Sequence, residues 1–160
     1  MDERKSTSEG AFFLGDSLVA WMSKKQCSIS LSTIEAEYIV AATCCTQVLW
    51  MIWTLADLEV KYTEPIPIHC DNTSAISVSK NPVLHSKTKH IPIKCHFLRE
   101  KVTNRVVQLN FISSTEKTAD IFTKPLSKTQ FEYICHKFSV IPDSNRSPHF
   151  DRGSFCLLNI

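Results

Sequence analysis

The first third of the chain alternates short apolar runs with polar turn residues. Residues 11–14 and 18–21 are apolar runs separated by Gly15-Asp16-Ser17. A three-residue connection that contains glycine between two such runs is typical of a β-hairpin. Residues 28–31 are expected to form a third short strand. The domain is therefore predicted to begin with β-structure.

A long helix is predicted to follow. Ser32 and Glu35 match a capping box, in which the serine hydroxyl caps the first turn and the glutamate reaches back to a backbone N–H. Apolar residues then recur at helical spacing, which predicts a helix to about Leu58. These residues are Tyr38, Ala41, Ala42, Cys45, Leu49, Ile52 and Ala56.

The remaining pattern mixes strands and helices. Strands are predicted at residues 66–70 and 107–111, and helices at 72–80, at 85–103 and from a Ser127 cap to about 138. A short helix that holds Asp120 is expected after 113–115. This order predicts an α/β fold with a mixed sheet and flanking helices. We expect one partial domain over residues 1–140 and a poorly ordered tail over 141–160.

Size and charge narrow the class of protein only slightly. The chain has 160 residues, of which 43% are hydrophobic, so it can bury one core. Lysine and arginine number 18 against 16 acids, a formal charge of +2. That balance does not by itself indicate nucleic-acid binding, which needs clustered basic residues. No apolar run approaches about 18 residues, so neither a membrane span nor a membrane partner is expected.

The cysteines suggest a reducing compartment. There are seven of them, and an odd count without an even framework is unlike a secreted disulfide scaffold. The neighbouring pairs His69-Cys70, Cys95-His96 and Cys135-His136 raise the possibility of zinc. However, adjacent side chains diverge and the chain has no C-x2-C pair. Buried free thiols are the favoured interpretation.

Three acids beside apolar residues are candidates for a metal site: Glu37, Asp71 and Asp120. Burying a carboxylate is costly unless it is paired or bound to a metal. Asp71 follows a predicted strand, and ligand sites in α/β sheets lie beyond the carboxyl ends of strands. Glu35 has a capping role, which leaves Glu37 available. The alternative is that each acid only caps a helix or pairs with a cation, and spacing alone does not decide.

Longer strings of residues carry a resemblance to a known family. Along the chain they include Arg4-Lys5-Ser6-Thr7-Ser8, Leu31-Ser32-Thr33-x-Glu35-Ala36-Glu37-Tyr38, His69-Cys70-Asp71-Asn72-x-Ser74 and Ala119-Asp120-Ile121-Phe122-Thr123-Lys124-Pro125. In this order, the strings resemble the C-terminal ribonuclease H domain of a Ty1/copia-type retrotransposon Pol polyprotein. The resemblance covers roughly residues 3–138.

The resemblance implies a fold, a reaction and partners. The fold is a ribonuclease H-like mixed sheet of five strands with helices on both faces. The family cleaves the RNA strand of an RNA–DNA hybrid with two Mg²⁺ ions, or Mn²⁺, held by four acids. Glu37, Asp71 and Asp120 match three of these catalytic metal ligands. The implied partners are the hybrid and, in an intact polyprotein, the reverse transcriptase portion.

The chain also departs from the family. In the family the fourth acid lies on a first strand that precedes the loop containing the Arg4–Ser8 string, and this chain begins in that loop, so we expect this strand to be missing. Glu9 stands where the family has glycine. We therefore expect the chain to be inactive on its own. The alternatives are a non-catalytic remnant with residual nucleic-acid binding or no function, and an unrelated interaction domain.

Five residues are candidates for contacts with nucleic acid: Asn72, Ser74, Lys24, Lys25 and Lys89. Asn72 and Ser74 follow the predicted strand end and are candidates for contact with RNA 2′-hydroxyl groups, which distinguish RNA from DNA. The simpler alternative is that they cap the following helix and that the lysines are solvated surface charges.

Overall fold

The computed structural model describes residues 5–15, 17–27, 29–60, 62, 65–80, 93–138 and 158–159. It begins with the antiparallel hairpin of β1 (Thr7–Leu14) and β2 (Ser17–Lys25), with a register shift between Phe12 and Phe13. Gly15 in the turn has a φ of 59°, which glycine adopts without strain. The predicted hairpin is confirmed, with strands longer than the apolar runs.

The capping box produces the helix that it predicts. Helix α1 (Thr33–Asp57) begins after Ser32, whose Oγ accepts a hydrogen bond of 3.2 Å from the Glu35 N–H. The strand predicted at 28–31 is wrong, because residues 29–31 lie in no strand. The backbone N–H of Leu31 instead donates to Glu35 Oε2 at 2.7 Å. The cap of α1 therefore occupies the Leu31 backbone N–H, which a strand would need for pairing with a neighbouring strand.

Most later elements fall where the pattern predicts them. They are β3 (Ile66–Cys70), α2 (Thr73–Lys80), α3 (Ile93–Thr103), β4 (Val107–Phe111) and α4 (Lys128–Lys137). Residues 85–92 of the predicted 85–103 helix lie outside the described residues. The short helix expected around Asp120 is instead two 3-10 helices, η2 (Ser114–Glu116) and η3 (Ala119–Phe122). They are interrupted at Lys117, whose backbone is extended.

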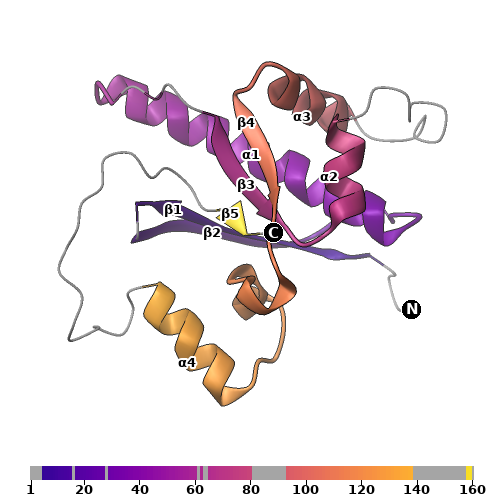
Figure 1. Ribbon diagram of the computed structural model, residues 1–160, viewed down its shortest axis with the longest axis vertical. Helices are drawn as coiled ribbons and strands as arrows, with labels where there is room; N and C mark the ends of the chain where they lie inside the picture. Colours follow the sequence, from indigo (N-terminus) through magenta and orange to yellow (C-terminus); the bar gives the residue numbers. More distant parts are fainter. Residues whose placement is uncertain are drawn as a thin grey trace.

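The sheet is mixed, which confirms the predicted class. Its strand order is β2-β1-β5-β3-β4, where β5 (Leu158–Asn159) runs antiparallel to β1 and parallel to β3 (Figure 1). Strand β5 was not anticipated, since residues 141–160 carry no strand pattern. It occupies the centre of the sheet, between β1 and β3. The rest of that segment lies outside the described residues.

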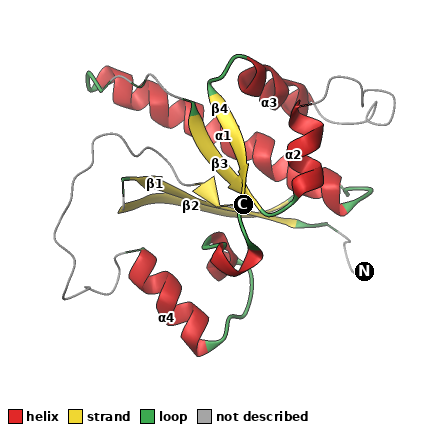
Figure 2. Ribbon diagram, viewed as in Figure 1, coloured by secondary structure: helices red, strands yellow, loops and turns green. Residues whose placement is uncertain are grey.

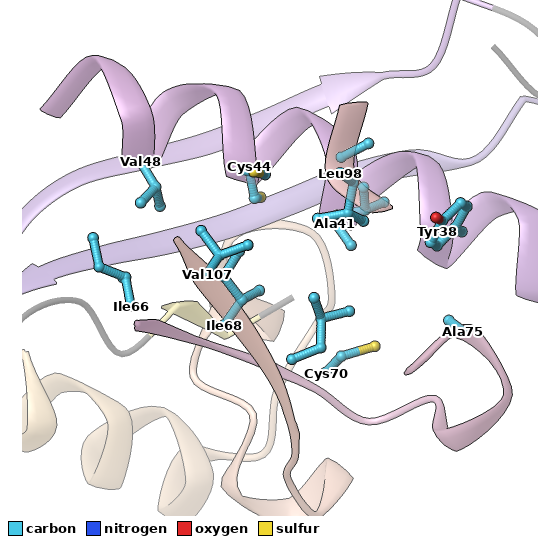
Figure 3. Close-up of a cluster of buried hydrophobic side chains, with 14 of the residues drawn as sticks. Tyr38, Ala41, Cys44, Val48, Ile66, Ile68, Cys70, Ala75, Leu98 and Val107 are labelled. Carbon is cyan, nitrogen blue, oxygen red and sulfur yellow. The ribbon is translucent and has the colours of Figure 1, made fainter. Parts of the chain in front are cut away.

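Helices cover both faces of the sheet (Figure 2). On one face Phe12, Ile66 and Ile68 pack in the main core with residues of α1, α2 and α3, several of which are shown in Figure 3. On the other face, Ala11 and Phe13 pack with Ala119, Ile134 and Phe138. Neighbouring residues of β1 thus enter opposite cores, as the period of a strand requires.

The sequence predicts that no segment is apolar and long enough to span a membrane, and helix α1 corrects this expectation. With 25 residues, α1 is long and apolar enough to cross a membrane by length and composition alone. Core helices also meet that criterion. Here Tyr38, Ala41, Cys44 and Val48 are almost fully buried in the main core, so packing within the domain accounts for the apolar composition of α1.

Candidate metal centre

Two of the three predicted acids meet at one end of the sheet. Glu37 comes from the second turn of α1, and Asp71 directly follows β3. Possible ligand atoms of Glu37, Asp71 and the neighbouring Cys70 all lie within 4.8 Å of one another. Elements far apart in the sequence therefore bring these groups together.

Local contacts fix the position of Asp71. The C=O of Cys70 accepts a hydrogen bond of 3.1 Å from the Ile112 N–H, which continues the pairing of β3 with β4. Ser114 Oγ donates to Asp71 Oδ2 at 3.2 Å. The Asn72 side chain accepts from the Ala75 N–H at 3.0 Å and caps the start of α2. Asp71 is thus held between a strand end and a helix start.

A buried glutamine ties the start of α1 to the hairpin. Gln26 Nε2 lies 3.1 Å from the C=O of Ala36 and 3.2 Å from the Ser8 hydroxyl, and donates to both. The next residue after Ala36 is Glu37, so these bonds hold the Glu37 backbone near the start of β1. The capping contacts of Glu35 with Ser32 and Leu31 confirm its local role.

Asp120 reaches the site on η3, which stacked aromatic rings hold against the hairpin. The Phe122 ring stacks on Trp21 of β2 and on Phe138, with centroid distances of 6.0 and 5.7 Å. Ser23 Oγ also donates to the C=O of Phe122 at 3.2 Å. These contacts hold the last residue of η3 in place, and Asp120 lies two residues earlier in the same short helix.

The ammonium group of Lys117 lies among the acids. Its Nζ is 3.1 Å from Glu9 Oε1, 3.6 Å from Asp120 Oδ1 and 3.7 Å from Asp71 Oδ2. Its side chain is only 4% exposed. From the outer side, the half-exposed Lys124 pairs with Asp120 Oδ2 at 2.9 Å. Two of the three predicted acids, Asp71 and Asp120, thus share a buried cation with Glu9.

Glu9 supplies a fourth carboxylate that sequence analysis missed as a site residue. Its side chain is 8% exposed and makes the shortest of the Lys117 ion pairs. The signal was present in the sequence, because Glu9 is an acid on the same strand face as the buried Ala11 and Phe13. The criterion applied to Glu37, Asp71 and Asp120 did not select it, because the chain neighbours of Glu9 are Ser8 and Gly10.

The electrostatics of the cluster reflect competition between burial and charge. Burial raises the pKa of Glu37, and Lys117 opposes that shift. Burial and the neighbouring Asp120 likewise raise the pKa of Glu9. Burial alone would lower the pKa of Lys117, but the charges of Glu37, Glu9 and Asp71 outweigh it and raise that pKa. Lys117 therefore stays charged at neutral pH and stabilises the ionised acids.

The donor set fits a hard divalent cation better than zinc. Carboxylate oxygens are the ligands that Mg²⁺ and Mn²⁺ prefer. Among the described residues, the buried Oδ1 of Asp120 accepts no hydrogen bond, so an oxygen ligand remains available. Burial raises the pKa of Cys70 to about 11, which keeps it a neutral thiol and a poor ligand. Cys44, Cys45, Cys70 and Cys135 are buried free cysteines, as predicted, whereas Cys27 is exposed.

The described residues predicted to contact nucleic acid lie at two separate elements, α2 and β2. Asn72 caps α2, as the simpler alternative holds, and Ser74 is exposed on the same helix. Lys24 and Lys25 are exposed at the end of β2. Lys89 lies outside the described residues. Contact of these residues with nucleic acid stays a prediction.

Comparisons with known proteins show that the chain is similar to transposon Pol polyproteins. It is 37% identical over 139 residues to the retrovirus-related Pol polyprotein from transposon RE1 of Arabidopsis thaliana, a match that covers 87% of this chain and 10% of that protein. It is 36% identical over 132 residues to the corresponding polyprotein from transposon TNT 1-94 of Nicotiana tabacum, covering 82% and 10%. No family model and no solved structure matches the chain.

Together with the mixed α/β fold, these matches support a retroelement-derived domain. Its homologues are Ty1/copia-type Pol polyproteins, which confirms that part of the resemblance. The chain spans about a tenth of the length of the curated relatives it matches.

Proposed function

We propose that the chain is a ribonuclease H-like domain whose acidic cluster serves metal-dependent hydrolysis of the RNA strand in RNA–DNA hybrids. The observation that carries the proposal is the convergence of Glu37 from α1, Asp71 from the end of β3 and Asp120 from η3. The same three acids match the family strings, and the homologues are transposon Pol polyproteins.

Each residue has a defined part in this function. Glu37, Asp71 and Asp120 would hold Mg²⁺ or Mn²⁺, with two ions expected in a complete site. When bound, such ions activate water and stabilise the leaving oxygen of a phosphodiester. The chain itself contributes fixed carboxylates, because Ser114 orients Asp71 and Lys124 orients Asp120. Lys24 and Lys25 would attract the phosphate backbone of the hybrid.

A hybrid-cleavage assay tests the proposal. A hybrid with a labelled RNA strand is incubated with the chain in Mg²⁺ or Mn²⁺, and the products are separated on a gel. We expect at most slow cleavage by the chain alone, and loss of any cleavage in Asp71→Asn. The matched control is Asp57→Asn at the far end of α1, which should leave cleavage unchanged.

A second candidate is a non-catalytic domain that retains hybrid binding. The buried ammonium of Lys117 favours it, because a fixed cation already neutralises the acids. Preferential binding of hybrid over double-stranded DNA, with no cleavage in either metal, would establish this alternative. Equal affinity for both duplexes together with no cleavage would overturn both candidates.

A further inference from the structure

Lys117 is placed where a cation would be expected in the acidic cluster. It lies on the extended segment between η2 and η3, which directs its side chain into the protein rather than toward solvent. Ion pairs join its Nζ to Glu9, Asp71 and Asp120, which come from three different parts of the fold. A single ammonium therefore links β1, the end of β3 and η3.

The geometry of these contacts differs from that of a surface ion pair. Lysine side chains are almost never fully buried without partners. Lys117 is 4% exposed, and its nearest partner Glu9 is 8% exposed. Lys124, on the other side of Asp120, is 53% exposed and remains in contact with water. Of the two lysines, only Lys117 lies within the buried part of the cluster.

One acceptor in the cluster remains incompletely satisfied. Asp120 Oδ1 is buried and accepts no hydrogen bond among the described residues, and its distance of 3.6 Å from Lys117 Nζ is longer than a charged hydrogen bond. An ammonium has three donors in tetrahedral directions and cannot match four carboxylates equally. A divalent ion accepts six or more oxygens and would serve this donor set better.

We propose that Lys117 is the resident cation of the cluster and competes directly with a divalent metal ion for Glu9, Asp71 and Asp120. The inference rests on the metal site of the proposed function but not on the cleavage reaction. Metal binding then requires the ammonium to withdraw from the acids. Glu9 becomes an additional ligand when it is released from Lys117.

Substituting Lys117 with methionine tests the competition. This change keeps a long apolar side chain and removes the charge. Without metal, Lys117→Met should unfold at a lower temperature than the wild type, because four carboxylates lose their counter-ion. Its affinity for Mn²⁺, measured by the electron paramagnetic resonance signal of free Mn²⁺, should be about tenfold higher, since the ion no longer displaces an ammonium.

Two further variants assign the effect to the buried lysine and to Glu9. Lys124→Met removes an ammonium from the same Asp120 carboxylate at the exposed rim, and should change Mn²⁺ affinity less than threefold. Adding Glu9→Gln to Lys117→Met should remove most of the gained affinity. Equal Mn²⁺ affinity of folded Lys117→Met and the wild type would overturn the proposal, as would an equal gain in Lys124→Met.

A measurement on the wild type covers the case in which Lys117→Met does not fold. The ¹⁵N resonance of the Lys117 Nζ should shift as Mg²⁺ is added, in step with the protection of the chain against thermal unfolding. A resonance that stays fixed while Mg²⁺ binds would overturn the competition. These metal-binding results are independent of hybrid cleavage, so a failed nuclease assay would not affect them.

Discussion

Gly10 of β1 lies directly against Cys44 of α1: a β-carbon at position 10 would come within 2.9 Å of the Cys44 Sγ. This close approach brings the strand that carries Glu9 next to the helix that carries Glu37. The contact therefore links the packing of the main core to the assembly of the acidic cluster.

Gly10→Ala is expected to destabilise the domain because the added methyl group overlaps the buried Cys44 thiol. Overpacking of this kind costs about 1–3 kcal/mol. Urea unfolding followed by circular dichroism would measure the loss. Adding Cys44→Ala should recover part of it, whereas Cys45→Ala, which removes the neighbouring buried thiol, should not. Equal behaviour of the two double variants would show that the close contact is not the cause.

The cap of α1 is expected to contribute measurably to stability. Ser32→Ala removes the hydroxyl that accepts from the Glu35 N–H, and loss of such a cap costs about 1 kcal/mol. Ser32→Asp should retain most of the stability, since aspartate also caps helices well. Denaturant unfolding of the two variants, with the exposed Ser74→Ala as control, decides this. Equal losses in Ser32→Ala and Ser32→Asp would contradict a capping role.

Local signals in the sequence were sufficient to predict much of the fold. The Ser32 and Ser127 caps and the alternating pattern of β4 specify elements through contacts within a few residues. Strand β5 carries no such signal, because its two residues owe their conformation to pairing with β1 and β3. The 28–31 segment shows the converse, since capping of α1 overrode its apparent strand propensity.

The candidate site could be predicted only for acids whose sequence neighbours are apolar. Glu37, Asp71 and Asp120 stand beside apolar residues, and the structure brings them together. Lys117 was not identified, because a lysine between polar residues is normally exposed. Its burial depends on carboxylates from β1, β3 and η3, and such long-range pairing leaves no local pattern.

The pH dependence of stability should contain a contribution from His69. Burial lowers its pKa from the usual value of 6.5, and its Nδ1 has no hydrogen-bond partner among the described residues. The unfolded chain therefore binds a proton near pH 6.5 before the folded chain does, so stability falls as the pH drops below that value. His69→Asn should remove this component. Unfolding free energies of the wild type and His69→Asn between pH 5 and 8 would show it, and an unchanged slope in the variant would rule out His69 as its source.

Hybrid binding is expected to depend on salt through Lys24 and Lys25, two consecutive exposed residues at the end of β2. Each phosphate contact that a lysine makes contributes about 0.9 to the slope of log affinity against log salt concentration for a DNA duplex, and we apply that value to the hybrid. Substituting both lysines with alanine should therefore weaken hybrid binding and reduce the slope by up to about two.

Fluorescence anisotropy with a labelled hybrid at several salt concentrations measures this slope. The matched control replaces Lys128 and Lys137 of α4 with alanine, which makes the same change of net charge on another element. If the two double variants lose affinity equally, the attraction comes from overall charge rather than from a binding surface on β2. A reduced slope only in the β2 variant would place the phosphate backbone beside β2, whose Trp21 stacks on Phe122 of η3.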